Sequence, residues 1–595
     1  MLYFVVVCHC HKVETHTRGQ SQRLNPSFHP LLSGTIDLYE DESKSYGFAS
    51  CLTLQCTSCS ASNEFYSSTH KAPKSAFAVN ERASFAFRMF GGGHATLSKF
   101  AEVMDMPKPV SRQCVKEHKL HVVDAAEEEA KLSMTNAAIA LQAAASTAES
   151  PQSNVEVSFD GSWSQRGYTA AYGYGAVVSV RSGKVLDYHV ASKVCPECAV
   201  WDKKDPDHMS DKWKAWKERP YEECTLNHAG SARAMEADIA EVLWMRSQEK
   251  NNLRYTTFVG DGDGASFGRV ASLKPYGSAP EAQVVKEDCI GHIQKRMGTR
   301  LREVKRTWKG RKLSYQKGIG GKQRLTNNRI NSYQVYYGKA MRNNLGNIDA
   351  ASDAVMAIFY HSISTDSKPQ HHLCPDTPTS WCGFRQSVRL NKAFKHKPAL
   401  PGAVAELVKP VFEALSDKAL LARCTKGLTQ NSNECIHSTM WIIVPKHIFH
   451  YPHVMNLAAA MSTGIFNDGH VFVGKVLNRL GYHTGQYTIK AMEKADEERV
   501  RKAKQEAKEQ TKADRKSRKW RKHQNEDQAT EKEGVMDEPG GFGPDGSLLQ
   551  IETPKDATAK QKKPRKCRKC GLPMKGHKRS QPCPTSTATG SEKKA

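Results

Sequence analysis

The segment spanning residues 155–287 constrains the fold of this 595-residue chain most strongly, because strand and helix patterns alternate in it in a definite order. Runs typical of strands lie at 155–160, 170–180, 185–192, 254–260 and 284–287. The turn Arg181-Ser182-Gly183-Lys184 joins the second and third runs as a hairpin, and a helix pattern at 232–249 precedes the fourth. This order predicts an α/β fold with a mixed five-stranded sheet and flanking helices.

Three acidic residues stand in informative positions relative to this pattern. Asp160 in VEVSFDGSW and Asp261 in YTTFVGDGDG each end a strand run, and Glu434 in TQNSNECIH opens a later apolar stretch. The strand order matches a ribonuclease H-like core, in which the first and fourth strands lie side by side. Asp160 and Asp261 are then neighbours. Asp263 competes with Asp261 for the second position, and we favour Asp261 because it directly follows the strand.

Two strand-end carboxylates and one from a later helix can hold two divalent metal ions. Such a site stabilises the attacking and leaving oxygens of an in-line phosphoryl displacement. Magnesium suits this chemistry because it binds few carboxylates and leaves room for substrate oxygens, and manganese is expected to substitute for it. The three acids therefore indicate phosphodiester chemistry on nucleic acid.

The charge of the chain agrees with a nucleic-acid partner. Lys and Arg number 87 against 62 Asp and Glu, a net charge of +25. Between residues 295 and 324 there are twelve basic residues and one acid, with Trp308 and Tyr315 interleaved, a pattern that suits phosphates and unpaired bases. The predicted DNA contacts in this segment are Lys295, Arg296, Arg300, Arg302, Lys305, Arg306, Trp308 and Arg311.

The 17 cysteines favour zinc in a reducing compartment, because many occur in Cys-x-x-Cys or Cys-x-x-His spacings near histidines. One structural zinc site is expected from Cys195, Cys198, Cys224 and His228. A zinc-knuckle-like module in a basic frame is expected from Cys567, Cys570, His577 and Cys583. Less regular sets are His361, His371, His372, Cys374 and Cys382, and the pair Cys56 and Cys59.

No run of about 18 to 20 apolar residues suggests a membrane span. Residues 2–8 are apolar but lack the flanks of a secretion signal, so the nucleus is the expected location. The predicted parts are 1–46, an irregular lead-in; 47–150, a module with a cysteine pair and helices; 155–292, the first part of the core; 293–425, a basic helical insertion; 426–489, the last part of the core; 490–562, a charged helix and linker; and 563–586, the zinc-knuckle-like module.

Between residues 47 and 490 the chain resembles the Mutator-like transposases. The resemblance rests on FDGSW around Asp160, VGDGDG around Asp261, CIGHIQKRMGTRLR around His292, KPQHHLCPDTPTSWC at 368–382, and TQNSNE ending at Glu434. It implies a cut-and-paste DNA transposase in which Asp160, Asp261 and Glu434 bind the catalytic metals. It also implies that Cys289 and His292, which alone would be read as a buried thiol and a core histidine, lie beside the active site and help to handle the DNA strand.

The implied partners are double-stranded DNA, as element terminal repeats and as target, and further copies of the chain on paired ends. The implied reaction cleaves the element end with water and then transfers the freed 3′-hydroxyl to target DNA. Two alternatives remain open at this stage. One is a domesticated, catalytically inactive zinc-containing DNA-binding protein, and the other is a nuclease for RNA–DNA hybrids.

Overall fold

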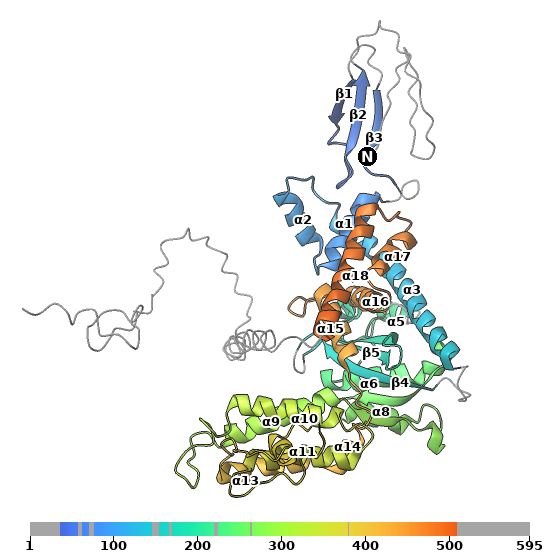
Figure 1. Cartoon of the computed structure of the whole chain (residues 1–595). Coiled ribbons are helices and arrows are strands. Elements are labelled where there is room, and N and C mark those ends of the chain that lie inside the picture. Colours follow the sequence, from blue (N-terminus) through green and yellow to red (C-terminus); the bar gives the residue numbers. More distant parts are fainter. Residues whose placement is uncertain are drawn as a thin grey trace, which may run out of the picture. The chain divides into compact units, whose positions relative to one another are not determined.

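The computed structural model describes residues 36–56, 62–70, 76–145, 154–165, 169–218, 224–261, 264–378 and 380–507 (Figure 1). A small antiparallel sheet comes first, with strands β1 (Ile36–Glu40), β2 (Cys51–Cys56) and β3 (Ser62–Tyr66) in that order. Strand β1 corrects the expectation that residues 1–46 lack regular structure. It pairs with β2 along its whole length, although Leu38 and Tyr39 are exposed, so backbone hydrogen bonds rather than a core define it.

The main sheet contains the five strands predicted from the sequence. They are β4 (Asn154–Trp163), β5 (Tyr172–Ser179), β6 (Val185–Ser192), β7 (Arg254–Gly260) and β8 (Val285–Asp288). Their order in the sheet is β6-β5-β4-β7-β8. The first three strands pair antiparallel, whereas β4, β7 and β8 are parallel neighbours. The predicted contact between the first and fourth strands is thus confirmed, and it determines where the two aspartates lie.

Helices cover both faces of this sheet, and β5 shows how its residues divide between them. Tyr172 and Tyr174 pack in one core with α3 (Arg112–Ala145), α15 (Asn431–Ile443), α16 (Pro452–Asp468) and α17 (Val471–Arg479). Val177 points into the other core with α6 (Ala232–Met245) and α8 (Ala265–Leu273). At Gly175 a Cβ would stand 2.7 Å from Ile239 Cγ2, so only glycine lets α6 approach β5 this closely.

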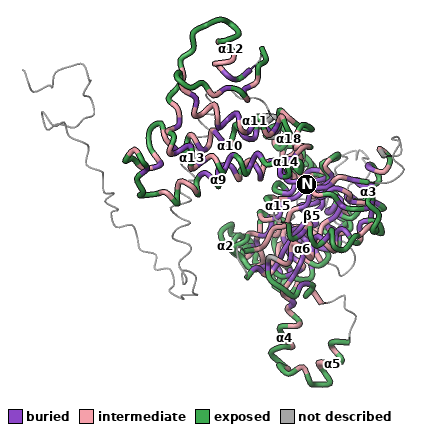
Figure 2. Tube along the Cα trace, turned by 90° about the horizontal axis from the view of Figure 1, so that it is seen from below, coloured by how far each residue is buried: buried purple, intermediate pink, exposed green. Residues whose placement is uncertain are grey.

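A separate group of helices follows the sheet in the sequence and has its own core. It consists of α9 (Ile290–Thr307), α10 (Asn327–Arg342), α11 (Ile348–Ile363), α13 (Gly402–Leu415) and α14 (Lys418–Ala422), and Figure 2 shows their buried faces. The short α12 (Gly383–Arg389) lies in the long connection between α11 and α13. The other helices are α1 (Ala78–Met89), α2 (His94–Val103), α4 (Pro196–Lys204), α5 (Asp211–Lys217), α7 (Ser247–Asn251) and α18 (Gln486–Ala507). None of the helices in the described residues combines the length and apolar character needed to cross a membrane.

Candidate active site

Strands β4 and β7 carry the first two predicted acids to the same edge of the sheet. Asp160 lies within β4, and Asp261 directly follows β7. In the parallel pairing of these strands, Ser158 lies opposite Val259. Continuing this register by two residues along both strands places Asp160 opposite Asp261. The charge of Asp261 acts on the Asp160 carboxyl group. The sheet therefore joins two carboxylates that are 101 positions apart in the sequence (261 − 160).

Helix α15 brings Glu434 to this edge in its first turn. A buried amide fixes the helix against the sheet, because Ser158 Oγ donates to Asn433 Oδ1 at 2.6 Å and Asn433 Nδ2 donates to Ala176 O at 2.8 Å. Two further hydrogen bonds from the helix segment to β4 run from Gln430 Nε2 to Phe159 O at 2.6 Å and from Trp441 Nε1 to Ser162 Oγ at 2.8 Å. The charge of Glu434 also acts on Asp160, so the third predicted acid joins the other two.

A fourth carboxylate, Glu236 on α6, belongs to the same cluster and was missed by the sequence reasoning. It lies against Gly161, where a Cβ would stand 2.6 Å from Glu236 Cγ. Its charge acts on Asp160 more strongly than those of Asp261 and Glu434. Glu236 directly follows the buried Met235, but a glutamate beside a buried helix stripe usually faces solvent, so no specific signal in the sequence pointed to it.

The electrostatics of the cluster suit a divalent cation. Burial raises the pKa of the Asp160 carboxyl to about 8, and the charges of Glu236, Asp261 and Glu434 act in the same direction. Like charges that are partly withdrawn from water repel one another, and a bound cation would offset that repulsion. The donors are carboxylate oxygens, which suit magnesium or manganese better than softer metals. The donor type present therefore suits the implied metal.

Two basic side chains of α9 contact Glu434. His292 Nε2 lies 3.4 Å and Lys295 Nζ lies 3.3 Å from Glu434 Oε1. Burial acts to raise the pKa of Glu434, but the hydrogen bond from His292 and the charge of Lys295 outweigh it and hold that pKa below its usual value. The thiol of Cys289, just before α9, accepts from the backbone N–H of Gln430 at 3.4 Å. Cys289 and His292 thus connect the start of α9 with the helix that carries Glu434.

His437 is a second residue of the site that the sequence reasoning missed. Its Nδ1 lies 3.5 Å from Asp160 Oδ2, one helical turn beyond Glu434. Burial lowers the pKa of His437 to about 4, so the ring is neutral at pH 7. Its buried Nε2 has no hydrogen-bond partner among the described residues. The spacing Glu434-x-x-His437 places both side chains on one helix face, and this spacing was the available signal.

The basic residues predicted to contact DNA lie mainly on the outer side of α9. Ile293, Met297 and Leu301 face the core of the helical group. On the other side, Lys295, Arg300, Arg302 and Arg306 are exposed, and Arg296 and Lys305 are half-buried. The N-terminal end of this basic surface is Lys295, which touches the carboxylate cluster. The helix therefore joins the cluster to a surface suited to phosphates.

Trp308, predicted to contact DNA, is partly buried at the end of α9. It ends α9 and packs, together with Tyr315, against the core of the helical group. The guanidinium of Arg311 lies over its ring, 5.6 Å from the centroid. Trp308 thus packs against the core of the helical group, and the exposed Arg311 lies beside it.

Three of the four residues predicted to form the first zinc site come together. The sulfur atoms of Cys195, Cys198 and Cys224 lie within 4.8 Å of one another. His228 does not join them, because its Nδ1 lies 2.7 Å from Asp238 Oδ2 and its Nε2 lies 3.1 Å from Ser231 O. Both ring nitrogens are thus engaged at the start of α6. The predicted set of four ligands is corrected to a group of three thiols.

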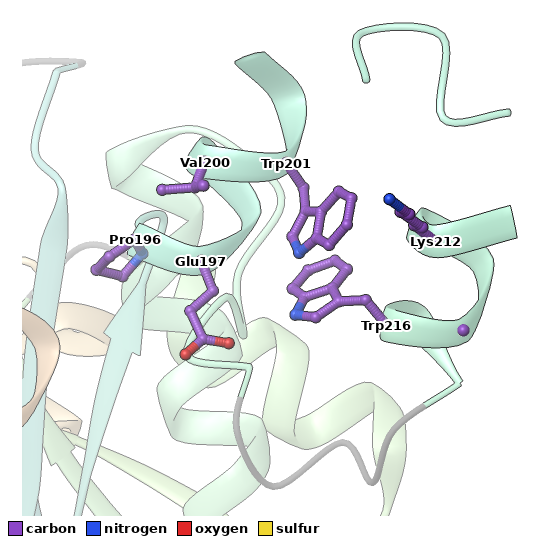
Figure 3. Close-up of a pocket in the computed structure, with 7 residues that line it drawn as sticks. Pro196, Glu197, Val200, Trp201, Lys212 and Trp216 are labelled. Atoms are coloured by element: carbon purple, nitrogen blue, oxygen red, sulfur yellow. The ribbon is translucent and has the colours of Figure 1, made fainter. Parts of the chain in front are cut away.

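These thiols lie at the base of a tryptophan-containing segment formed by α4 and α5. Trp201 and Trp216 face each other with ring centroids 5.5 Å apart, and with Val200 and Lys212 they line an open hollow (Figure 3). Neither helix buries a residue of its own. The paired indoles are therefore one of the contacts between α4 and α5.

Several predicted residues cannot be placed. Asp263, the competitor of Asp261, lies outside the described residues. So do the second residue of the early cysteine pair and the zinc-knuckle-like set, namely Cys59, Cys567, Cys570, His577 and Cys583. These assignments stay predictions.

Comparison with known proteins identifies the family. A family model described as Mutator-like transposase matches residues 18–382, well over half of the chain, and the chain therefore belongs to the Mutator-like transposase family. The matched region includes Asp160, Asp261 and His292 and ends before α15. No curated protein and no solved structure matches the chain.

Proposed function

We propose that this chain is a cut-and-paste DNA transposase whose catalytic centre is the carboxylate cluster of Asp160, Asp261 and Glu434. The observation that carries the proposal is the convergence of these acids from β4, β7 and α15 at the start of the basic helix α9. Membership of the Mutator-like family supports a transposase role. The strand order β6-β5-β4-β7-β8, with parallel β4 and β7 carrying the acids, supports a ribonuclease H-like core.

Asp160, Asp261 and Glu434 would hold magnesium or manganese, with Glu236 close enough to add to the negative field. When bound, such ions stabilise the attacking and leaving oxygens of an in-line displacement at phosphorus. The chain's own residues position the substrate around that centre. Lys295 offers a positive charge to a phosphate, and His292 can donate to a strand that lies across Glu434. Neutral His437, on the buried side, lies 3.5 Å from the Asp160 carboxylate.

The DNA would follow the basic face of α9 away from the cluster. An 18-residue helix is about 27 Å long at 1.5 Å per residue. That length corresponds to roughly eight base-pair steps of 3.4 Å. Arg300 and Arg302 are exposed along this face. The helix can therefore contact several phosphates on the approach to the cleavage position.

Neutralising this face is expected to weaken DNA binding in a salt-dependent way. We predict that Arg300→Gln and Arg302→Gln each lower duplex affinity and reduce the slope of log affinity against log salt by about 1, because one phosphate contact is lost. Fluorescence anisotropy with the full chain at several salt concentrations measures both quantities. Arg181→Gln, at an exposed turn between β5 and β6, is the matched control and should change neither. Equal slopes for all three variants would place the DNA elsewhere.

The proposed metal site also makes a prediction about stability. Because the pKa of Asp160 is raised from 3.8 to about 8, wild-type protein loses stability as the pH rises from about 4 to about 8. Asp160→Asn removes that charge and is expected to gain about 1–2 kcal/mol over wild type at pH 8 without divalent metal. Thermal melts in a chelator across this pH range check the difference. Manganese should restore the wild type and leave the variant unchanged.

The experiment that tests the proposed function combines manganese titration with DNA cleavage. Calorimetry of the full chain is expected to show manganese binding that Asp160→Asn loses, and plasmid DNA should be nicked only with the metal. Salt-sensitive binding to DNA without nicking would instead favour the catalytically inactive DNA-binding protein. Faster cleavage of an RNA–DNA hybrid than of duplex DNA would favour the hybrid nuclease.

A further inference from the structure

A group of four side chains in the connection between α11 and α13 has metal-binding geometry. His361 comes from the end of α11, His371 and Cys374 from the loop, and Cys382 from the N-cap position of α12. One donor atom from each lies within 4.8 Å of the other three. The proposed carboxylate site does not involve them. Their irregular spacing in the sequence conceals a compact arrangement in space.

The distances within this group match the edges of a tetrahedron around zinc. The two Sγ atoms lie 3.4–3.8 Å from the Nδ1 atoms of the two histidines, which lie 3.2 Å apart. With zinc–sulfur bonds of about 2.3 Å and zinc–nitrogen bonds of about 2.05 Å, ideal tetrahedral edges are about 3.6 Å for S···N and about 3.3 Å for N···N. Two thiolates and two imidazoles in this geometry suit zinc rather than magnesium or calcium.

A hydrogen-bond chain prepares His371 to act as a ligand. Asp366 Oδ1 lies 2.6 Å from His396 Nδ1, and His396 Nε2 lies 2.9 Å from His371 Nε2. A neutral His396 that donates to Asp366 presents a lone pair at Nε2. His371 must then carry its proton on Nε2, which leaves the Nδ1 lone pair directed at the two thiols. A carboxylate behind the histidine is the usual support for such a ligand.

The connection needs an organiser, because it has almost no core of its own. Among the described residues of 365–399, the buried side chains are those of His371, Cys374, Ser380 and Cys382. Three of these four belong to the group. The one helix in this stretch, α12, buries none of its residues, and Figure 2 shows it apart from α10 and α13. A loop of this composition is ordered by metal ligation rather than by apolar packing.

We propose that His361, His371, Cys374 and Cys382 form a structural zinc site that folds the connection between α11 and α13. The folded connection presents six basic residues against two acids between 364 and 400, namely Lys368, Arg385, Arg389, Lys392, Lys395 and Lys397 against Asp366 and Asp376. This zinc site shares no residue with the carboxylate cluster. Its assignment does not depend on whether the chain cleaves DNA.

Cysteine labelling of the wild-type full chain tests the site without a mutation. After zinc removal by a chelator, Cys374 and Cys382 are expected to react with a maleimide at least about tenfold faster, and added zinc, but not magnesium, should restore protection. Cys424 is equally buried and lies outside the group, so its slow labelling is the internal control. Peptide mass spectrometry separates these sites from Cys195, Cys198 and Cys224. Unchanged labelling of Cys374 and Cys382 would overturn the proposal.

The supporting hydrogen-bond chain offers a second test with exposed residues. Asp366→Asn is expected to weaken zinc retention against a chelator by about tenfold, because the charge behind His396 and His371 is removed. Asp376→Asn is the matched control, since Asp366 and Asp376 are 60% and 62% exposed in the same loop and Asp376 contacts Arg385 and Arg389. Equal retention in both variants would exclude the role assigned to the chain of histidines.

Discussion

Replacing Glu434 with glutamine is expected to lower metal-dependent DNA cleavage by about a thousandfold or more. The metal supplies several kcal/mol of charge stabilisation in the transition state, and each 1.36 kcal/mol is a factor of ten in rate. The side chain of Glu434 is 50% exposed, and glutamine has the same size and can still accept from Lys295. The buried hydrogen bonds of Asn433 that fix α15 are untouched by this change. The loss of activity should therefore occur in a protein that melts as the wild type does.

The measurement is nicking of supercoiled plasmid by the full chain in manganese, with melting temperature recorded for each variant. Glu303→Gln on α9 is the matched control, because Glu303 is 54% exposed and pairs with a basic neighbour, Arg306. It should retain full nicking. Asp261→Asn and Asp263→Asn, tested side by side, decide which of the two acids acts with Asp160. Nicking that survives in Asp160→Asn and Glu434→Gln alike would refute the carboxylate centre.

Local patterns in the sequence were sufficient to place the sheet and two of its acids. The bounds of β6 and β7 agree with the predicted runs 185–192 and 254–260, because each run is a short apolar segment flanked by clear turn residues. Asp160 and Asp261 followed from strand ends and strand order alone. Glu434 was selected because it opens a later apolar stretch and was supported by the resemblance to the transposase family, but its position was established only when the packing of α15 against β4 was known.

The parts that could not be predicted depend on contacts between distant segments. Nothing near Glu236 in the sequence indicates Gly161, whose missing side chain lets the two approach. His228 has suitable spacing for a zinc ligand, yet Asp238 and the backbone of Ser231 engage its ring. His361 and Cys382, by contrast, belong to a candidate set named from the sequence, and they meet despite their irregular spacing, whereas His372 of that set is not part of the group. Spacing rules are reliable when the ligands lie in one short loop, and they fail when a helix end supplies one of them.

The scaffold behind the site contains a buried ion pair whose loss is expected to destabilise the protein by about 3 kcal/mol. Asp187 on β6 is fully buried, and Arg246 contacts both of its oxygens, with Nε at 2.7 Å and Nη2 at 2.9 Å. Lys250 Nζ supplies a further contact at 2.5 Å. Arg246→Met would leave the buried carboxylate with Lys250 as its one ionic partner among the described residues, beside the backbone N–H of Tyr188. Because a partly unpaired buried charge costs far more than a lost surface contact, the melting temperature should fall by several degrees.

Arg269→Met is the matched control for this prediction. Its guanidinium contacts Glu241 at 2.6 Å, a distance like that of the buried pair, but the arginine and glutamate side chains are 51% and 32% exposed. Water can replace the lost partner there, so the cost should stay below about 1 kcal/mol. The double variant Asp187→Asn with Arg246→Met separates charge from packing. If the buried carboxylate is the cause, removing its charge should recover much of the stability lost in Arg246→Met, whereas a packing defect would persist or increase.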